Sequence, residues 1–185
     1  CDVAPGTHHI DPNRVEGMVT PRTTAIIGVH VWGAPAPVDE LTEIANRHGL
    51  HLMFDAAHAL GSSYKRRMIG GFGEAEILSF HATKFLNSFE GGAVLTNDDE
   101  LADRMRYMRN FGFAGVDQVD YVGTNGKMSE VAAAMGLTSL DCIHDIIATN
   151  KRNYDAYRSG LAEIPGIEVY TYDETEHNNF QYIIL

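Results

Sequence analysis

Two short apolar runs flank an amphipathic stretch in the first third of the chain. The run TTAIIGVHVWG (23–33) is β-branched and almost continuously apolar, and LHLMF follows at 50–54. Such runs are typical of strands in a sheet that is covered on both faces. Between them, Pro37 opens VDELTEIANRH, whose apolar residues recur at helical spacing, and Gly49 is the expected stop. The pattern predicts a right-handed βαβ unit with parallel strands.

A second pair of strand-like runs follows, AEILSF (75–80) and GGAVLTN (91–97). The link between them is too short for a crossover helix, so the fourth strand is expected to be antiparallel to its neighbours. Asn97 or Asp98 then caps a helix over residues 99–108, with acidic residues in its first turn. The pattern predicts an α/β protein with a mostly parallel sheet and one antiparallel strand.

The last third of the chain begins with helical periodicity. Residues 128–140 form one helical stretch, and residues 141–161 continue as a long amphipathic helix that ends before Pro165. The runs IEVYTY (167–172) and FQYIIL (180–185) are apolar and rich in β-formers. They predict strands of a second structural unit.

We therefore expect a domain boundary within or just after the long helix. Residues 1–150 are assigned to part of a large domain, and residues 151–185 to a linking helix and the start of a smaller α+β domain. The sequence begins without methionine, and its final apolar run has nothing after it to bury it. The chain is thus expected to be an internal piece of a longer protein.

Charge and composition exclude several classes of function. The formal net charge of −11 argues against a nucleic-acid surface, which needs a basic stripe to displace counterions. No apolar run reaches the roughly 18 residues of a membrane span. Two cysteines, Cys1 and Cys142, are too few for a disulfide framework and lack metal-ligand spacing. With no signal peptide visible, these features predict a cytoplasmic protein without a metal site.

Three polar residues fall at the carboxyl ends of predicted strands, where parallel α/β sheets bind ligands. Asp55 follows the second strand, Ser79 lies near the end of the third, and Lys84 comes just beyond it. Pyridoxal phosphate needs a lysine for a Schiff base, a carboxylate at its pyridinium nitrogen, and donors for its phosphate. Each residue alone is more simply explained as a helix cap, a loop cap or a solvated lysine. Their combination in this order favours a cofactor site.

Three longer motifs then carry a family resemblance: FDAAHALGSSY, SFHATKFLNSFEGGAVLTND and GTNGKMSEVAAAMGL. In order and spacing they resemble the DegT/DnrJ/StrS group of sugar aminotransferases, and the likeness runs along nearly the whole chain. The resemblance implies a pyridoxal-phosphate enzyme of the aspartate aminotransferase fold, fold type I. Its large domain is a three-layer α/β/α structure, followed by a smaller C-terminal domain.

The resemblance also implies roles for five residues. Lys84 resembles the Schiff-base lysine, and Asp55 the acid that pairs with the pyridine nitrogen. His58 occupies a position next to the cofactor's phenolic oxygen, and Ser79 resembles the hydroxyl that binds the cofactor phosphate. Asn125 resembles an asparagine that reaches the phosphate of the neighbouring subunit. Because relatives that perform deoxygenation carry histidine in place of the lysine, Lys84 indicates transamination.

The implied function is transfer of an amino group from an amino acid, glutamate by hypothesis, to a nucleotide-linked keto-sugar in amino-sugar biosynthesis. The implied assembly is a homodimer with shared active sites. A keto-cyclitol or a small keto-acid is an alternative acceptor on the same scaffold. The family's N-terminal phosphate-binding turn and ring-stacking aromatic residue are absent, and FLNSFEGG replaces the commoner LTTGEGG. The isolated chain is therefore expected to be inactive, and a non-catalytic binding or dimerisation fragment is the other alternative.

Overall fold

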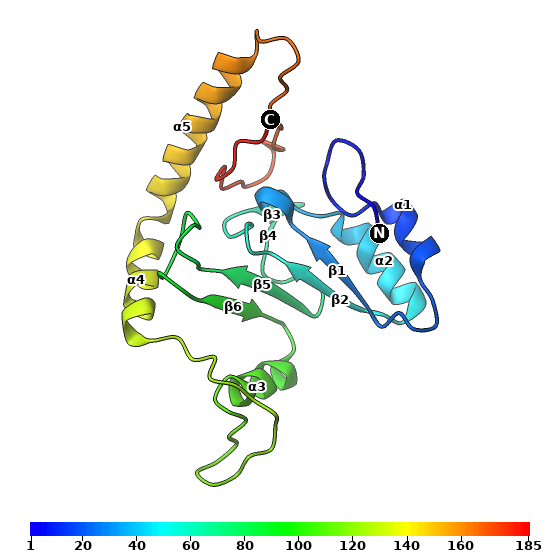
Figure 1. Cartoon of the computed structure of the whole chain (residues 1–185), viewed down its shortest axis with the longest axis vertical. Coiled ribbons are helices and arrows are strands. Elements are labelled where there is room, and N and C mark those ends of the chain that lie inside the picture. Colours follow the sequence, from blue (N-terminus) through cyan, green and yellow to red (C-terminus); the bar gives the residue numbers. More distant parts are fainter.

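A four-stranded mixed sheet forms the centre of the computed structural model, which describes all residues from Cys1 to Leu185 (Figure 1). The strand order is β1-β2-β5-β6, in which β1, β2 and β5 are parallel and β6 is antiparallel to β5. The strands are β1 (Ala25–Val29), β2 (His51–Asp55), β5 (Ala75–Ser79) and β6 (Gly92–Leu95). The predicted α/β class, with its single antiparallel strand, is confirmed.

Helix α2 (Val38–His48) crosses from β1 to β2 and covers one face of the sheet. Its apolar stripe packs on Ile26, Leu52 and Phe54 in the main core, and α1 (Pro12–Met18) packs against the outside of α2. The Phe54 ring of β2 packs directly on the backbone of β1, because a Cβ atom at Gly28 would come within 2.7 Å of that ring. The helix ends as predicted at Gly49, whose φ of 62° suits glycine.

The other face of the sheet is open. It presents large apolar side chains from β1, β5 and β6, and Ile27 on β1 is 58% exposed. The prediction that the first strand is covered on both faces is therefore wrong for this chain. The apolar run is real, but helices α1 and α2 supply a covering layer on one side only.

Three helices follow the sheet. Helix α3 (Asp99–Met108) begins at Asp98, whose carboxylate accepts the Leu101 N–H, so the predicted cap is confirmed. Helices α4 (Glu130–Asp141) and α5 (Ile143–Leu161) follow, with a 63° bend between them. No single helix is long and apolar enough to cross a membrane, although this bent pair meets that test by length and composition.

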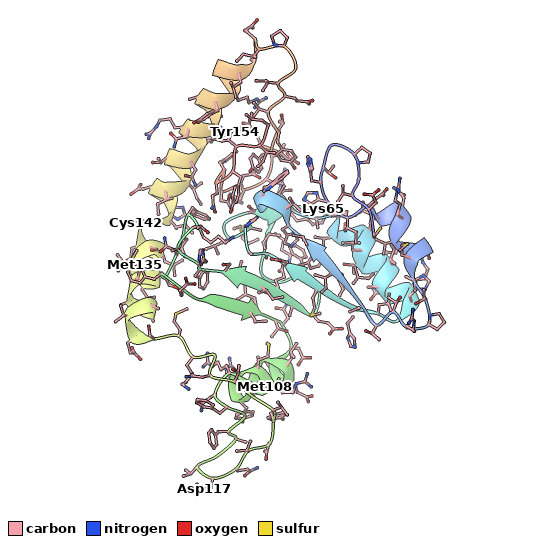
Figure 2. All side chains as sticks on the ribbon, in the orientation of Figure 1. Lys65, Met108, Asp117, Met135, Cys142 and Tyr154 are labelled. Atoms are coloured by element: carbon pink, nitrogen blue, oxygen red, sulfur yellow. The ribbon has the colours of Figure 1, made fainter.

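The C-terminal strands predicted at 167–172 and 180–185 are wrong, because neither stretch is part of a strand. One backbone hydrogen bond joins them, from Tyr170 N–H to the Ile184 carbonyl at 2.9 Å. Their aromatic residues instead pack on α5, where Tyr154 is fully buried beside Tyr172 and Phe180. Figure 2 shows Tyr154 beside the side chains of this C-terminal segment. The segment thus returns toward the sheet.

Three elements were not predicted from the sequence. They are α1, the 3-10 turn η1 (Val31–Gly33) after β1, and a small hairpin of β3 (Ser63–Tyr64) and β4 (Arg67–Met68). The turn η1 replaces the end of the predicted first strand, with Trp32 at φ 54°. Its neighbour Gly33 has no room for a side chain, because a Cβ atom there would lie 2.8 Å from the His58 carbonyl oxygen.

Candidate active site

The carboxyl ends of β1, β2 and β5 meet at one edge of the sheet, and Asp55 ends the middle strand. In the register of these strands Asp55 pairs with Val29 on one side and with Ile77 on the other. Its Oδ1 accepts the Ala57 N–H at 3.0 Å, and its carbonyl accepts the His30 N–H at 2.9 Å. The second carboxylate oxygen has no partner in the chain. Asp55 therefore presents a free, oriented acceptor at the edge where parallel α/β sheets generally bind ligands.

Ser79 lies at the same edge, at the end of the neighbouring strand β5. It pairs with Gly92 of β6, and its Oγ accepts the His81 N–H at 3.3 Å. Gly92 is required here because a Cβ atom would come within 2.6 Å of the Leu78 carbonyl oxygen. The hydroxyl of Ser79 keeps its proton free to donate to a ligand.

Lys84 lies in the loop between β5 and β6 and is half-buried. Its N–H donates to the His81 carbonyl at 2.9 Å, so a tight turn fixes the backbone at this position. Lys65 and Lys151 form ion pairs with carboxylates, whereas Lys84 forms none. His81 is engaged at the surface, with Thr83 at 2.9 Å and Glu90 at 3.5 Å. The amine of Lys84 is thus placed by the backbone and left without a charged partner.

His58 connects these groups electrostatically. Burial lowers its pKa from the ordinary value, the nearby Lys84 cation lowers it further, and the Asp55 carboxylate opposes both effects. The imidazole lies against the Tyr182 ring, with 4.6 Å between the ring centroids. A histidine with a lowered pKa is neutral at pH 7. His58 is therefore suited to hydrogen bonding rather than to carrying charge.

Four of the five residues expected in the site share this edge, and Asn125 does not. Asp55, His58, Ser79 and Lys84 come from β2, β5 and the loops that follow them. Asn125 lies in the segment between α3 and α4, where it is exposed and forms a β-bridge with Asn110. That segment projects away from the sheet edge, and Asp117 lies at its tip (Figure 2).

The sequence interpretation missed three further residues at this edge: Asn179, Gln181 and Tyr182. Their side chains contact the loops that carry His58 and Lys84. The signal was present as three amide side chains, Asn178, Asn179 and Gln181, at the start of the last apolar run. Nothing local in that stretch shows which part of the chain it contacts.

The donor set fits pyridoxal phosphate. Lys84 is partly buried and forms no ion pair, so its amine is available to bond to an aldehyde carbon. The free oxygen of Asp55 suits a protonated ring nitrogen, the neutral imidazole of His58 suits a phenolic oxygen, and the Ser79 hydroxyl suits a phosphate.

Comparison with known proteins agrees with this chemistry. The sequence model of the DegT/DnrJ/EryC1/StrS aminotransferase family matches residues 1–185. A dTDP-4-amino-4,6-dideoxy-D-glucose transaminase of Shigella dysenteriae is 38% identical over 91% of this chain and 46% of its own length. A dTDP-3-amino-3,4,6-trideoxy-alpha-D-glucose transaminase of Streptomyces venezuelae is 42% identical over 85% of this chain and 42% of its own length.

Among solved structures, that of DesI in the presence of its TDP-sugar product is 52% identical and superimposes with a TM-score of 0.93. The match covers 99% of this chain and 47% of that one. The fold is therefore that of the fold type I aminotransferases, and the chain spans less than half the length of these relatives.

Proposed function

The chain belongs to the DegT/DnrJ/EryC1/StrS aminotransferase family, and from this premise we propose that it is the lysine-bearing part of a pyridoxal-phosphate-dependent sugar aminotransferase. The amino donor is an amino acid, glutamate in our hypothesis, and the acceptor is a nucleotide-linked keto-sugar. The names of the similar transaminases support this acceptor class. The observation that carries the proposal is the unpaired Lys84 beside His58 and Asp55 at the sheet edge.

Pyridoxal phosphate, when bound, supplies an electron-withdrawing ring that stabilises charge on the carbon that loses its proton. Lys84 Nζ would hold the cofactor and then move a proton as general base and acid. The free oxygen of Asp55 would keep the proton on the ring nitrogen. Neutral His58 would contact the phenolic oxygen, and the Ser79 hydroxyl would donate to the phosphate.

The proposed assembly is a homodimer with shared active sites, in which Asn125 serves the partner's phosphate. Apolar exposure in the segment that carries Asn125 supports it, since Val116 and Val122 are 95% and 93% exposed. Helix α4 adds the exposed side chains of Val131 and Leu137. Apolar side chains this exposed are typical of a surface that another chain covers.

The proposed division into domains and the proposed location complete this picture. Residues 1–150 would form part of the cofactor-binding large domain, and residues 151–185 the linking helix and the start of a smaller domain. The aromatic residues Tyr154, Tyr172 and Phe180, which pack together and on Ala34, all belong to the second of these parts and support this division. Cys1 and Cys142 are free and exposed, which suits a reducing cytoplasm.

The test is to add pyridoxal phosphate to the chain, reduce with borohydride, and locate the pyridoxyl group by mass spectrometry. We expect the label on Lys84, and its loss in Lys84→Ala. Lys65→Ala is the matched control, because Lys65 is exposed and paired with Asp39. Labelling that persists in Lys84→Ala at the wild-type level would contradict the assignment.

The same preparation separates the alternatives. No spectral change on adding the cofactor would identify the chain as a non-catalytic binding or dimerisation fragment. If the longer protein is active, mass profiling of aminated products would distinguish a nucleotide-linked keto-sugar from a keto-cyclitol or a small keto-acid.

A further inference from the structure

The carboxamide of Gln181 holds the peptide groups on both sides of Lys84. Its Oε1 accepts the Phe85 N–H at 3.2 Å, and its Nε2 donates to the Thr83 carbonyl at 3.1 Å. These two contacts span 96 and 98 residues of sequence. A primary amide presents one acceptor and one donor in a single plane, which matches this pair of peptide groups. The side chain thus fixes the backbone from which Lys84 projects.

Asn179 forms the corresponding contact with the loop that carries His58. Its Nδ2 donates to the carbonyls of His58 and Leu60 at 2.7 and 3.0 Å, and its Oδ1 accepts the Gln181 N–H at 3.1 Å. Asn179 is 1% exposed, so these bonds are shielded from water. The ring of Tyr182 then lies against the imidazole of His58. One short stretch therefore contacts both loops of the site.

This stretch is itself firmly attached to the rest of the chain. Asn150 on α5 donates from Nδ2 to the Asn179 carbonyl at 3.0 Å. The Tyr172 hydroxyl lies 3.1 Å from the Trp32 carbonyl and 2.9 Å from the Tyr182 carbonyl. Helix α5, and the turn η1 through Tyr172, thus support residues 179–182 with hydrogen bonds from two elements.

We infer that Gln181 and Asn179 are positioning residues, which set the Lys84 loop and the His58 loop relative to each other through neutral amide contacts. The inference rests on the proposed function, because it assigns these residues to the same site. Neutrality matters at Gln181, since a carboxylate beside Lys84 would stabilise the ammonium form and suppress the nucleophilic amine. A carboxylate at this position would also lack the donor that the Thr83 carbonyl needs.

The test compares Gln181→Ala and Gln181→Glu in the cofactor-free chain. Hydrogen–deuterium exchange at the Phe85 amide should be roughly two- to tenfold faster in Gln181→Ala, the factor expected for loss of one hydrogen bond, whereas Gln181→Glu keeps an acceptor for that N–H. Acetylation of Lys84 by acetic anhydride, followed by mass spectrometry as a function of pH, should shift to higher pH in Gln181→Glu only. Gln118→Glu, in an exposed loop, is the matched control and should change neither measurement.

Circular dichroism shows whether each variant is folded, and the two substitutions keep the test usable if one of them is not. Unchanged exchange at Phe85 in folded Gln181→Ala would overturn the positioning role. A pH profile of Lys84 acetylation that is the same in Gln181→Glu as in the wild type would overturn the argument from neutrality. Since no cofactor is present, either failure is distinct from a failure of Lys84 to bind pyridoxal phosphate.

Discussion

Two histidine–glutamate pairs link the elements of the sheet, and only one of them is buried. His30 and Glu76 are both 0% exposed, with Nε2 3.0 Å from Oε1. His51 and Glu74 have side chains 68% and 52% exposed, with Nδ1 2.7 Å from Oε1. The same substitution, glutamate to glutamine, should therefore have very different effects on stability at the two positions.

The buried carboxylate accepts three N–H groups. His30 Nε2 donates to Oε1, while the backbone N–H groups of Gly70 and Phe72 donate to Oε2 at 2.5 and 2.8 Å. The ring proton of His30 is on Nε2, because Nδ1 accepts the Ala36 N–H at 2.9 Å. All three hydrogen bonds of the Glu76 side chain are thus accepted from N–H groups. These N–H groups have no other acceptor.

Glu76→Gln turns one oxygen into an NH₂ group that faces a donor, and we expect a loss of about 1–3 kcal/mol in the free energy of unfolding. Glu76→Ala removes all the acceptors and should cost about 3–5 kcal/mol. Glu74→Gln should cost less than about 1 kcal/mol, because its pair is solvated. The buried network also reaches the site, since the His30 N–H donates to the Asp55 carbonyl.

Urea unfolding provides the measurement, with Trp32, the single tryptophan, as the fluorescent probe. The midpoint should fall markedly for Glu76→Gln and little for Glu74→Gln, at an unchanged slope. If the two variants unfold at the same urea concentration, Glu76 is not acting as a buried acceptor and the reasoning is refuted.

Two further predictions concern the site loop and the small hairpin. NMR titration should give His58 a pKa below 6.5, raised by Lys84→Met and lowered by Asp55→Asn. Because the folded state has the lower pKa, the unfolded chain binds the extra proton, so stability should fall as pH drops through 6.5; opposite signs would exclude this charge arrangement. Lys65 and Arg66 have φ of 50° and 63°, so Arg66→Gly should stabilise the chain by about 1 kcal/mol in urea unfolding. An unchanged or lower midpoint would show that this turn stores no strain.

The parts of the fold that the sequence predicted are those that local pattern determines. Helix α2 and strand β2 were predicted because their apolar residues repeat at the period of one element and end at Gly49 or Asp55. Strand topology then places Asp55 and Ser79 at one edge without knowledge of any side-chain contact. These predictions needed only periodicity and the direction of the strands.

The C-terminal stretch was beyond such reasoning. FQYIIL has the composition of a strand, yet no neighbouring strand offers it a ladder, and its aromatic residues pack on Tyr154 instead. Its contacts with the site join residues far apart in the chain, since Asn179 and the His58 carbonyl are 121 residues apart. Local propensity carries no information about such a long-range contact.

The proposed role of Lys84 requires a neutral amine, and a carboxylate beside it would keep that amine charged, so the position of the side chain has to come from the backbone. Around Lys84 that support is complete. The turn to His81 fixes its own N–H, Ser88 donates to the Phe80 carbonyl at 3.0 Å, and Gln181 holds the flanking peptide groups. All these bonds involve neutral groups and leave Nζ free. The missing ion pair and the distant amide contact therefore have one physical cause, since neutral support is the kind that positions an amine without keeping it charged.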